Sequence, residues 1–183
     1  MSMGIIIVIA IVIILVVVAI SLYNNLVALR NRVDNAWAQI DVQLQRRLDL
    51  IPNLVETVKG YASHERGTLD EVTAARSAVM QAATPADKMA ADNMLTSSLK
   101  SLFAVAEAYP DLKANVNFQQ LQSQLAETED KISYMRQSYN DTVMKYNTAI
   151  QTFPGVLFSG MFKPRQSFEA AQAAATAPVV NFN

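Results

Sequence analysis

The chain lacks the residues on which much enzyme and metal chemistry depends. It has no cysteine and one histidine among 183 residues. Disulfides, thiol nucleophiles and thiolate metal sites are therefore excluded, although this does not fix the compartment. The one imidazole, His64, has no serine pattern around it, and Thr68 stands where a zinc-binding helix would carry its second histidine. With five glycines and six prolines, the composition favours helix throughout.

Charge is equally uninformative about catalysis. The net charge is −1, so nothing suggests nucleic-acid binding, which would need a clustered basic face. Glycine-rich phosphate loops are absent, and carboxylate pairs such as Asp34 and Asp41 are interpreted as solvated charges on helix surfaces. The sequence therefore predicts no catalytic, cofactor-binding or metal site, no cofactor and no enzyme.

One long apolar stretch stands out against this background. Gly4 to Leu22 carries no charge, and as a helix it would be about 28 Å long, close to the thickness of a bilayer's hydrocarbon core. A lone segment in lipid must be helical to pair its backbone, despite its many Ile and Val residues. The alternative is a cleaved signal peptide, with Ala19-Ile20-Ser21 as the cleavage site. The long core and the uncharged start favour a retained anchor over residues 1–23.

The arginines near the anchor predict its orientation. None precedes the apolar stretch, whereas Arg30 and Arg32, then Arg46 and Arg47, follow it. Positive residues accumulate on the cytoplasmic side of membrane spans. We therefore expect a single-pass membrane protein with its soluble part in the cytoplasm.

The helix is expected to continue beyond the membrane. No proline or further glycine occurs until Pro52, which should kink the helix rather than end it because the apolar stripe keeps its phase beyond it. Arg47 interrupts that stripe. A second stripe runs along the last helix. Both have the spacing of an amphipathic helix. From the two stripes we expect buried core anchors at Trp37, Leu44, Ile51, Tyr139 and Tyr146.

Cap residues predict where the other helices begin. Thr68 and Glu71 have the spacing of a capping box, Thr84-Pro85 restarts the helix after a short break, and Asn117 opens the last long helix. The resulting arms, 23–62, 68–108 and 117–153, are similar in length. This predicts an all-α fold: a transmembrane helix continuous with an antiparallel up-down-up bundle (24–153) of three long arms, the middle one broken.

The C-terminal segment (154–183) combines an apolar loop with an Ala-rich tail. On the three-arm topology the loop lies at the membrane-distal end, where its apolar residues either tuck over the bundle or meet another molecule. Phe158, Met161 and Phe162 are the predicted protein-interaction residues. The tail from Glu169 is expected to be poorly ordered unless a partner holds it.

Several motifs resemble those of the LemA family in order and spacing, over about residues 1 to 170. They are Tyr23-Asn24-Asn25-Leu26-Val27, Ala36-Trp37-Ala38-Gln39-Ile40-Asp41, Arg46-Arg47, Asp49-Leu50-Ile51-Pro52-Asn53-Leu54, Tyr109-Pro110-Asp111-Leu112-Lys113-Ala114-Asn115, Arg136, Tyr139-Asn140-Asp141, Tyr146-Asn147 and Phe153-Pro154. The resemblance implies a bacterial single-pass membrane protein with a helical bundle. It implies no enzymatic activity and supplies no catalytic residues.

Two functions fit these observations. The preferred hypothesis is a non-enzymatic scaffold in the lipid bilayer that forms homo-oligomers and presents a surface to unidentified protein partners. Its contacts should come from the soluble bundle, because Gly4, Ala10 and Ala19 are too sparse for close packing of membrane helices. The alternative is a monomeric adaptor or sensor stalk that recruits clients to a membrane protease or signalling partner. A ligand-binding enzyme ranks third, since the stripes supply no converging polar groups.

Overall fold

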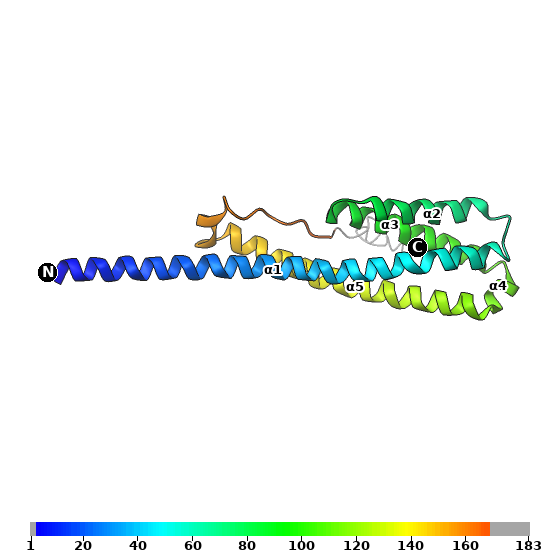
Figure 1. The fold of residues 1–183 in the computed structure, drawn as a ribbon, viewed down its shortest axis with the longest axis horizontal. Coiled ribbons are helices and arrows are strands. Elements are labelled where there is room, and N and C mark those ends of the chain that lie inside the picture. Colours follow the sequence, from blue (N-terminus) through cyan, green and yellow to red (C-terminus); the bar gives the residue numbers. More distant parts are fainter. Residues whose placement is uncertain (1–2, 169–183) are drawn as a thin grey trace, which may run out of the picture. The chain divides into compact units, whose positions relative to one another are not determined.

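The computed structural model describes residues 3–168, whose regular elements are all helical (Figure 1), and this confirms the all-α prediction. The elements are α1 (Met3–Lys59), α2 (Arg66–Gln81), α3 (Pro85–Ala106), α4 (Pro110–Ala114), α5 (Val116–Gln151) and the 3₁₀ turn η1 (Gly155–Phe158). The described chain divides into two compact units. Unit 1 takes residues 3–38 and 137–167, and unit 2 takes 39–136 and 168.

Helix α1 begins in the apolar stretch and continues without interruption. It passes through Pro52 to Lys59, as the unbroken phase of its stripe predicts. Its N-terminal window has a mean hydropathy of 3.7 with no residue buried, and among the described residues it is the one helix long and apolar enough to cross a membrane. The predicted candidate transmembrane helix, continuous with the soluble part, is thus present.

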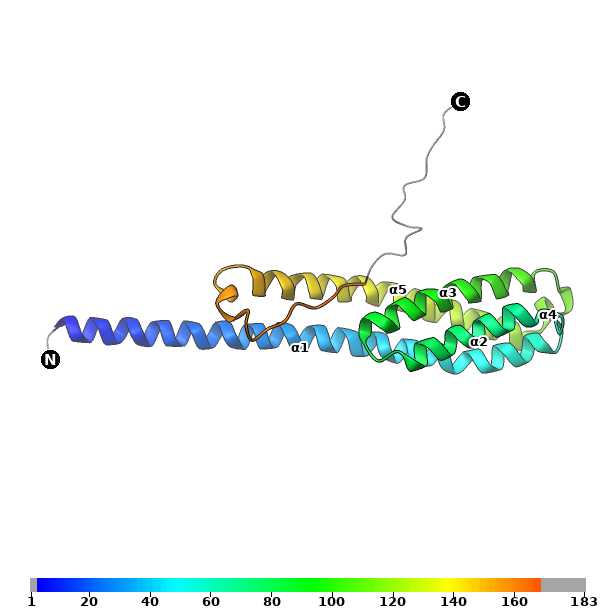
Figure 2. The same ribbon diagram turned by 90° about the horizontal axis from the view of Figure 1, so that it is seen from above.

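Unit 2 is an antiparallel arrangement of four long helical segments, with the short α4 between α3 and α5. The C-terminal part of α1, then α2, α3 and the N-terminal part of α5 alternate in direction (Figure 2). The apolar faces of α2 and α3 pack directly against each other, and their buried residues join those of α1 and α5 in one core. The core includes Ile51, Leu54, Val58, Leu69, Val72, Val79, Leu95, Leu99, Leu102, Leu112, Phe118 and Leu125.

The three-arm topology was therefore wrong in its middle arm. The break at Ala82–Thr84 is a reversal, so α2 and α3 form a hairpin instead of one long broken helix. The physical reason is that each of these helices has its own apolar face, and folding the faces together removes both from water.

The helix caps test the helix starts predicted from the sequence. Thr84 caps α3 as predicted, with its hydroxyl accepting from the Asp87 N–H at 3.2 Å. The Thr68–Glu71 capping box was wrong, because α2 already begins at Arg66 and no side chain caps it. Helix α5 begins at Val116, before Asn117, because the Asn115 side chain accepts from the Phe118 N–H at 3.0 Å and fixes the first turn there.

Unit 1 packs the C-terminal part of α5 against the N-terminal part of α1. Its buried side chains are Leu26, Val33, Tyr139, Val143, Tyr146, Ile150 and Phe162. Gly155 begins η1 in contact with α5, where a Cβ would stand 1.9 Å from the Ala149 carbonyl oxygen. Glycine is therefore required for this turn to close against the helix.

The apolar loop lies at the opposite end from the one predicted. The Phe158 and Phe162 rings are centred 6.2 and 5.6 Å from the ring of Tyr23, the first residue after the apolar stretch. The loop therefore lies at the end of unit 1 next to the apolar stretch. The cause is the additional reversal between α2 and α3, which inverts the direction of every later segment. The tail from Glu169 lies outside the described residues.

Candidate functional site

A cluster of charged side chains is buried inside unit 2. Arg47 Nη1 of α1 donates to Asp92 Oδ1 of α3 at 2.8 Å, and Arg136 of α5 binds the other carboxylate oxygen. The side chains of Arg47 and Asp92 are 3% and 0% exposed. Arg47 also donates to the Thr96 hydroxyl at 3.0 Å and contacts the Glu129 carboxylate at 2.8 Å. Three helices are thereby joined through one carboxylate.

The electrostatics of this cluster suit a structural role. Burial raises the pKa of the Asp92 carboxyl above its ordinary value, although Arg47 and Arg136 oppose that shift and Glu129 adds to it. Both carboxylate oxygens are taken up by the arginines. The cluster therefore joins α1, α3 and α5 through one buried carboxylate, each oxygen of which accepts from an arginine.

Sequence reasoning missed this cluster, although a signal was present. Arg47 lies on the apolar stripe of α1 between Leu44 and Ile51, and Asp92 lies between Met89 and Leu95 on the stripe of α3. A charge at a core position is retained only if it is paired. Opposite charges at core positions of two helices predict such a pair.

The predicted interaction residues do not form one exposed surface. Met161 is exposed, Phe158 is half-buried and Phe162 is buried. Phe162 packs on Tyr23, and its ring also lies 5.8 Å below the Arg30 guanidinium. Phe162 is thus a core residue of unit 1, because the loop tucks against α1. The apolar residues that remain exposed here are Phe153, Val156, Leu157 and Met161.

The segment after the loop is fastened to α5 by side-chain hydrogen bonds. The Tyr146 hydroxyl donates to the Lys163 carbonyl at 3.0 Å, and the Tyr139 hydroxyl donates to the Gln166 carbonyl at 3.1 Å. Asn147 pairs with both backbone groups of Arg165, at 2.8 and 2.9 Å. Burial raises the pKa of the Tyr139 and Tyr146 phenols, so both donate as neutral hydroxyls. We call residues 163–167 the strap.

The strap and α1 enclose a basic pocket. Its volume is about 430 Å³, and its lining residues are Arg30, Tyr146, Met161, Phe162, Lys163, Pro164 and Arg165. Arg165 donates to the Asp34 carboxylate at 2.9 Å. Among the described residues, Arg30 and Lys163 have no ion-pair partner. The pocket therefore presents positive charge close to the end of the apolar stretch.

The expected core anchors occupy different depths. Leu44, Ile51, Tyr139 and Tyr146 are buried, whereas Trp37 is half-buried and meets the Tyr139 ring edge-on at 6.0 Å between centroids. The Tyr139 and Tyr146 side chains also hold the strap. A hydroxyl at the end of a buried ring could have suggested such a partner.

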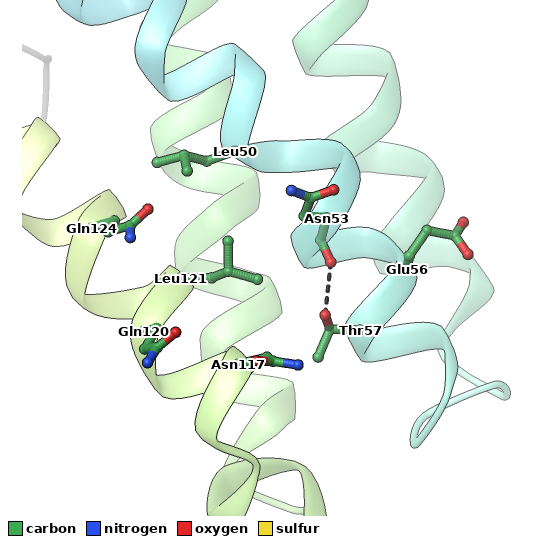
Figure 3. A pocket seen from close by; sticks show the side chains of 8 residues that line it. All are labelled: Leu50, Asn53, Glu56, Thr57, Asn117, Gln120, Leu121 and Gln124. Atoms are coloured by element: carbon green, nitrogen blue, oxygen red, sulfur yellow. Dashed lines mark hydrogen bonds between the residues drawn. The ribbon is translucent and has the colours of Figure 1, made fainter.

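The described part of unit 2 also has hollows on its surface, and two of them bear on function. Figure 3 shows the first, between α1 and α5, where polar side chains surround Leu50 and Leu121 and the Thr57 hydroxyl donates to the Asn53 carbonyl at 2.8 Å. Its other lining residues are Glu56, Asn117, Gln120 and Gln124. Neutral amides predominate, so this hollow mainly offers hydrogen bonds, and Glu56 is the one carboxylate in its lining. Within residues 3–168 no group of His, Cys, Asp and Glu could hold a metal ion.

The second hollow is a groove between α2 and α3. It has a volume of about 490 Å³ and a mainly apolar lining: Glu71, Ala74, Ala75, Ala78, Met94, Ser97, Ser98 and Ser101. Ala74 and Ala78 lie one turn apart on α2, and Ser97 and Ser101 lie one turn apart on α3. Small side chains on both walls leave room for another helix.

Comparison with known proteins places these features in a family. The LemA family matches residues 36–182. Protein LemA of Metamycoplasma hominis is 27% identical over 134 residues, which are 71% of this chain and 60% of that protein. Magnetosome protein MamQ 2 of Paramagnetospirillum magneticum is 23% identical over 186 residues, with 86% of this chain and 68% of that protein covered. The chain thus spans about 60% of the length of the mycoplasma relative.

Proposed function

Because the chain belongs to the LemA family, we propose that it is a non-enzymatic helical scaffold, anchored in the bacterial inner membrane by a single span, that self-associates and presents an interaction surface. The observation that carries this proposal is the continuity of α1. One helix contains the apolar stretch and then supplies core residues to the folded part of the chain, so anchor and bundle are a single element. The names of the relatives denote no reaction.

Membrane anchoring follows from the exposure of the apolar stretch. Its Ile, Val and Leu side chains are exposed along the whole N-terminal part of α1. Each would gain about 1.5–3 kcal/mol on leaving water. Lipid is the environment that removes this surface from water while the helix satisfies its own backbone.

Self-association is assigned to the groove between α2 and α3. The walls of the groove carry small side chains, which allow another helix to approach closely: Ala74, Ala78, Ser97 and Ser101. The exposed Met94 supplies an adaptable apolar contact. A second copy that offers the same hairpin face would bury both grooves in one self-complementary interface. The proposed occupant is therefore another copy of this chain.

The orientation is proposed from the arginines. Arg30 and Arg32 follow the apolar stretch within the distance over which positive residues act on topology. We therefore propose that the bundle lies in the cytoplasm. Protease added to intact spheroplasts should leave a C-terminal tag uncut, and cleavage of the tag would reverse the orientation.

The mass of the detergent-solubilised particle tests the scaffold. The wild type should contain more than one chain. Ala74→Glu with Ser97→Glu should reduce the mass to one chain plus detergent without loss of helical circular dichroism, because the charges block the groove. Ala90→Glu is the matched control: Ala90 is likewise exposed on α3 but does not line the groove.

Cysteine cross-linking gives a second measurement. The chain has no cysteine, so each introduced thiol is unique. Ala74→Cys should give covalent dimers in membranes with a short bismaleimide, and Ala90→Cys should give fewer. A wild type that runs as one chain plus detergent would refute self-association and favour the monomeric adaptor. An oligomer that survives both glutamates would move the interface away from the groove.

A further inference from the structure

We propose that the membrane-proximal end of unit 1 docks on an anionic lipid surface, with Phe153, Leu157 and Met161 in the interfacial layer and Arg30 and Lys163 on lipid phosphates. The proposal rests on the anchoring in the proposed function and adds a second, lipid-selective contact to it.

The position of the loop relative to the anchor is the first argument. Tyr23 directly follows the apolar stretch, and its ring contacts Phe158 and Phe162. Figures 1 and 2 both show η1 (orange) beside α1. It lies where the N-terminal part of α1 that no other element covers begins. If Leu22 ends the hydrocarbon span, the loop lies at the depth of the headgroups.

The exposure of the loop is the second argument. Phe153, Leu157 and Met161 are 80%, 71% and 66% exposed, and all lie within nine residues of one another. Contiguous exposed apolar side chains mark an interaction site. A loop next to a membrane span lies beside the bilayer surface. The lipid headgroups are therefore the proposed partner of these side chains.

Charge is the third argument. Unit 1 carries five basic residues (Arg30, Arg32, Lys145, Lys163 and Arg165) against Asp34 and Asp141, a net side-chain charge of +3, although the whole chain is −1. Three of the five line the pocket beside the loop. Basic pockets at the membrane surface attract anionic headgroups.

The basic groups are also held in position. The Phe162 ring lies below the Arg30 guanidinium, Tyr146 holds the backbone of Lys163, and Asn147 holds that of Arg165. A site that is already ordered loses less entropy on binding. Arg guanidinium groups match phosphate oxygens in geometry, and Lys adds a point charge.

Tryptophan quenching by brominated lipids tests the depth of the loop in the full chain. The single tryptophan is first removed by Trp37→Phe. Three probes are then compared in nanodiscs: Ile13→Trp in the apolar stretch, Leu157→Trp in the loop, and Gln137→Trp, which is exposed on α5 about 21 Å from the helix end. Bromines near the headgroup should quench the probe at 157, those deep in the acyl chains should quench the probe at 13, and neither should quench the probe at 137.

Headgroup selectivity is tested with the probe at 157. Brominated phosphatidylglycerol should compete against phosphatidylcholine for this position. Arg30→Gln with Lys163→Gln should weaken that preference by about 30-fold, the loss expected for two basic residues at an anionic surface. Arg32→Gln with Lys145→Gln is the control, because it removes the same charge from exposed positions of unit 1 outside the pocket.

The outcomes separate the two proposals. Absence of quenching at 13 would refute the membrane anchor of the proposed function. Quenching at 13 without quenching at 157 would leave the anchor intact and overturn the docking of the loop. Equal quenching by both headgroups, or equal losses in the two double variants, would overturn the phosphate site. Unchanged circular dichroism in each variant shows that the bundle is folded.

Discussion

Removal of Arg47 from the buried cluster is the sharpest test of how unit 2 is held together. In Arg47→Met, the fully buried Asp92 carboxylate keeps Arg136 but loses its contact at 2.8 Å. Removing one partner of a buried ion pair costs about 3–5 kcal/mol when the remaining charge is poorly compensated. Here Asp92 retains only Arg136, and Glu129 also loses its contact with Arg47. For a chain of this size, that corresponds to a fall in melting temperature of about 6–20 °C.

The pH dependence of that loss identifies its cause. The folded-state pKa of Asp92 is already raised by burial, and loss of Arg47 should raise it further. The stability contribution of a carboxyl with a raised pKa is fully present below its unfolded pKa and is lost as pH rises through its folded pKa. The deficit of Arg47→Met relative to the wild type should therefore be largest near neutral pH and should shrink as the pH falls towards about 4.

Two variants control this measurement. Lys88→Met breaks the Asp41–Lys88 pair, which joins the same helices at 2.6 Å but is partly exposed, and it should cost less than about 1 kcal/mol. Arg47→Met with Asp92→Leu removes both buried charges and should recover most of the stability. Thermal unfolding of the full chain in detergent, followed by circular dichroism, measures all of them. A deficit equal to that of Lys88→Met, or one independent of pH, would refute the assigned role of the cluster.

The remaining predictions concern unit 1. Gly155→Ala should lower the melting temperature and expose the loop to protease, because its Cβ would overlap the Ala149 carbonyl; Gly160→Ala, with open space around its Cβ, should do neither. Tyr146→Phe should cost about 0.5–1.5 kcal/mol through its lost hydrogen bond, and no change in unfolding would contradict that bond. Trp37→Ala should cost about 2–3 kcal/mol, less than a fully buried tryptophan, by the same assay. Because burial raises the pKa of the Tyr139 and Tyr146 phenols, the free energy of unfolding should fall as the pH rises above about 10.

The sequence by itself determined the features that depend on neighbouring residues. The uncharged stretch after Met3 fixes a candidate membrane helix, and the absence of glycine and proline as far as Pro52 extends it into the bundle. Apolar spacing identified four of the five expected core anchors as buried side chains. The Thr84-Pro85 pair fixed the start of α3. Each of these follows from helix periodicity, capping or hydrophobicity within a few turns.

Only the tertiary structure decided the direction of the later helices and the partners of the charged residues. The cap at Thr84 begins a helix whether the chain continues or reverses there, and the reversal depends on the packing of α2 against α3. This reversal places the apolar loop beside Tyr23 and the basic strap beside Arg30. The contact between Arg47 and Asp92 likewise joins positions 45 residues apart. Each charge is visible on its own apolar stripe, but the packing of the helices decides which partner it meets. Long-range packing sets these features because the free energy gained by burying an apolar face does not depend on how far apart the two faces lie in the sequence.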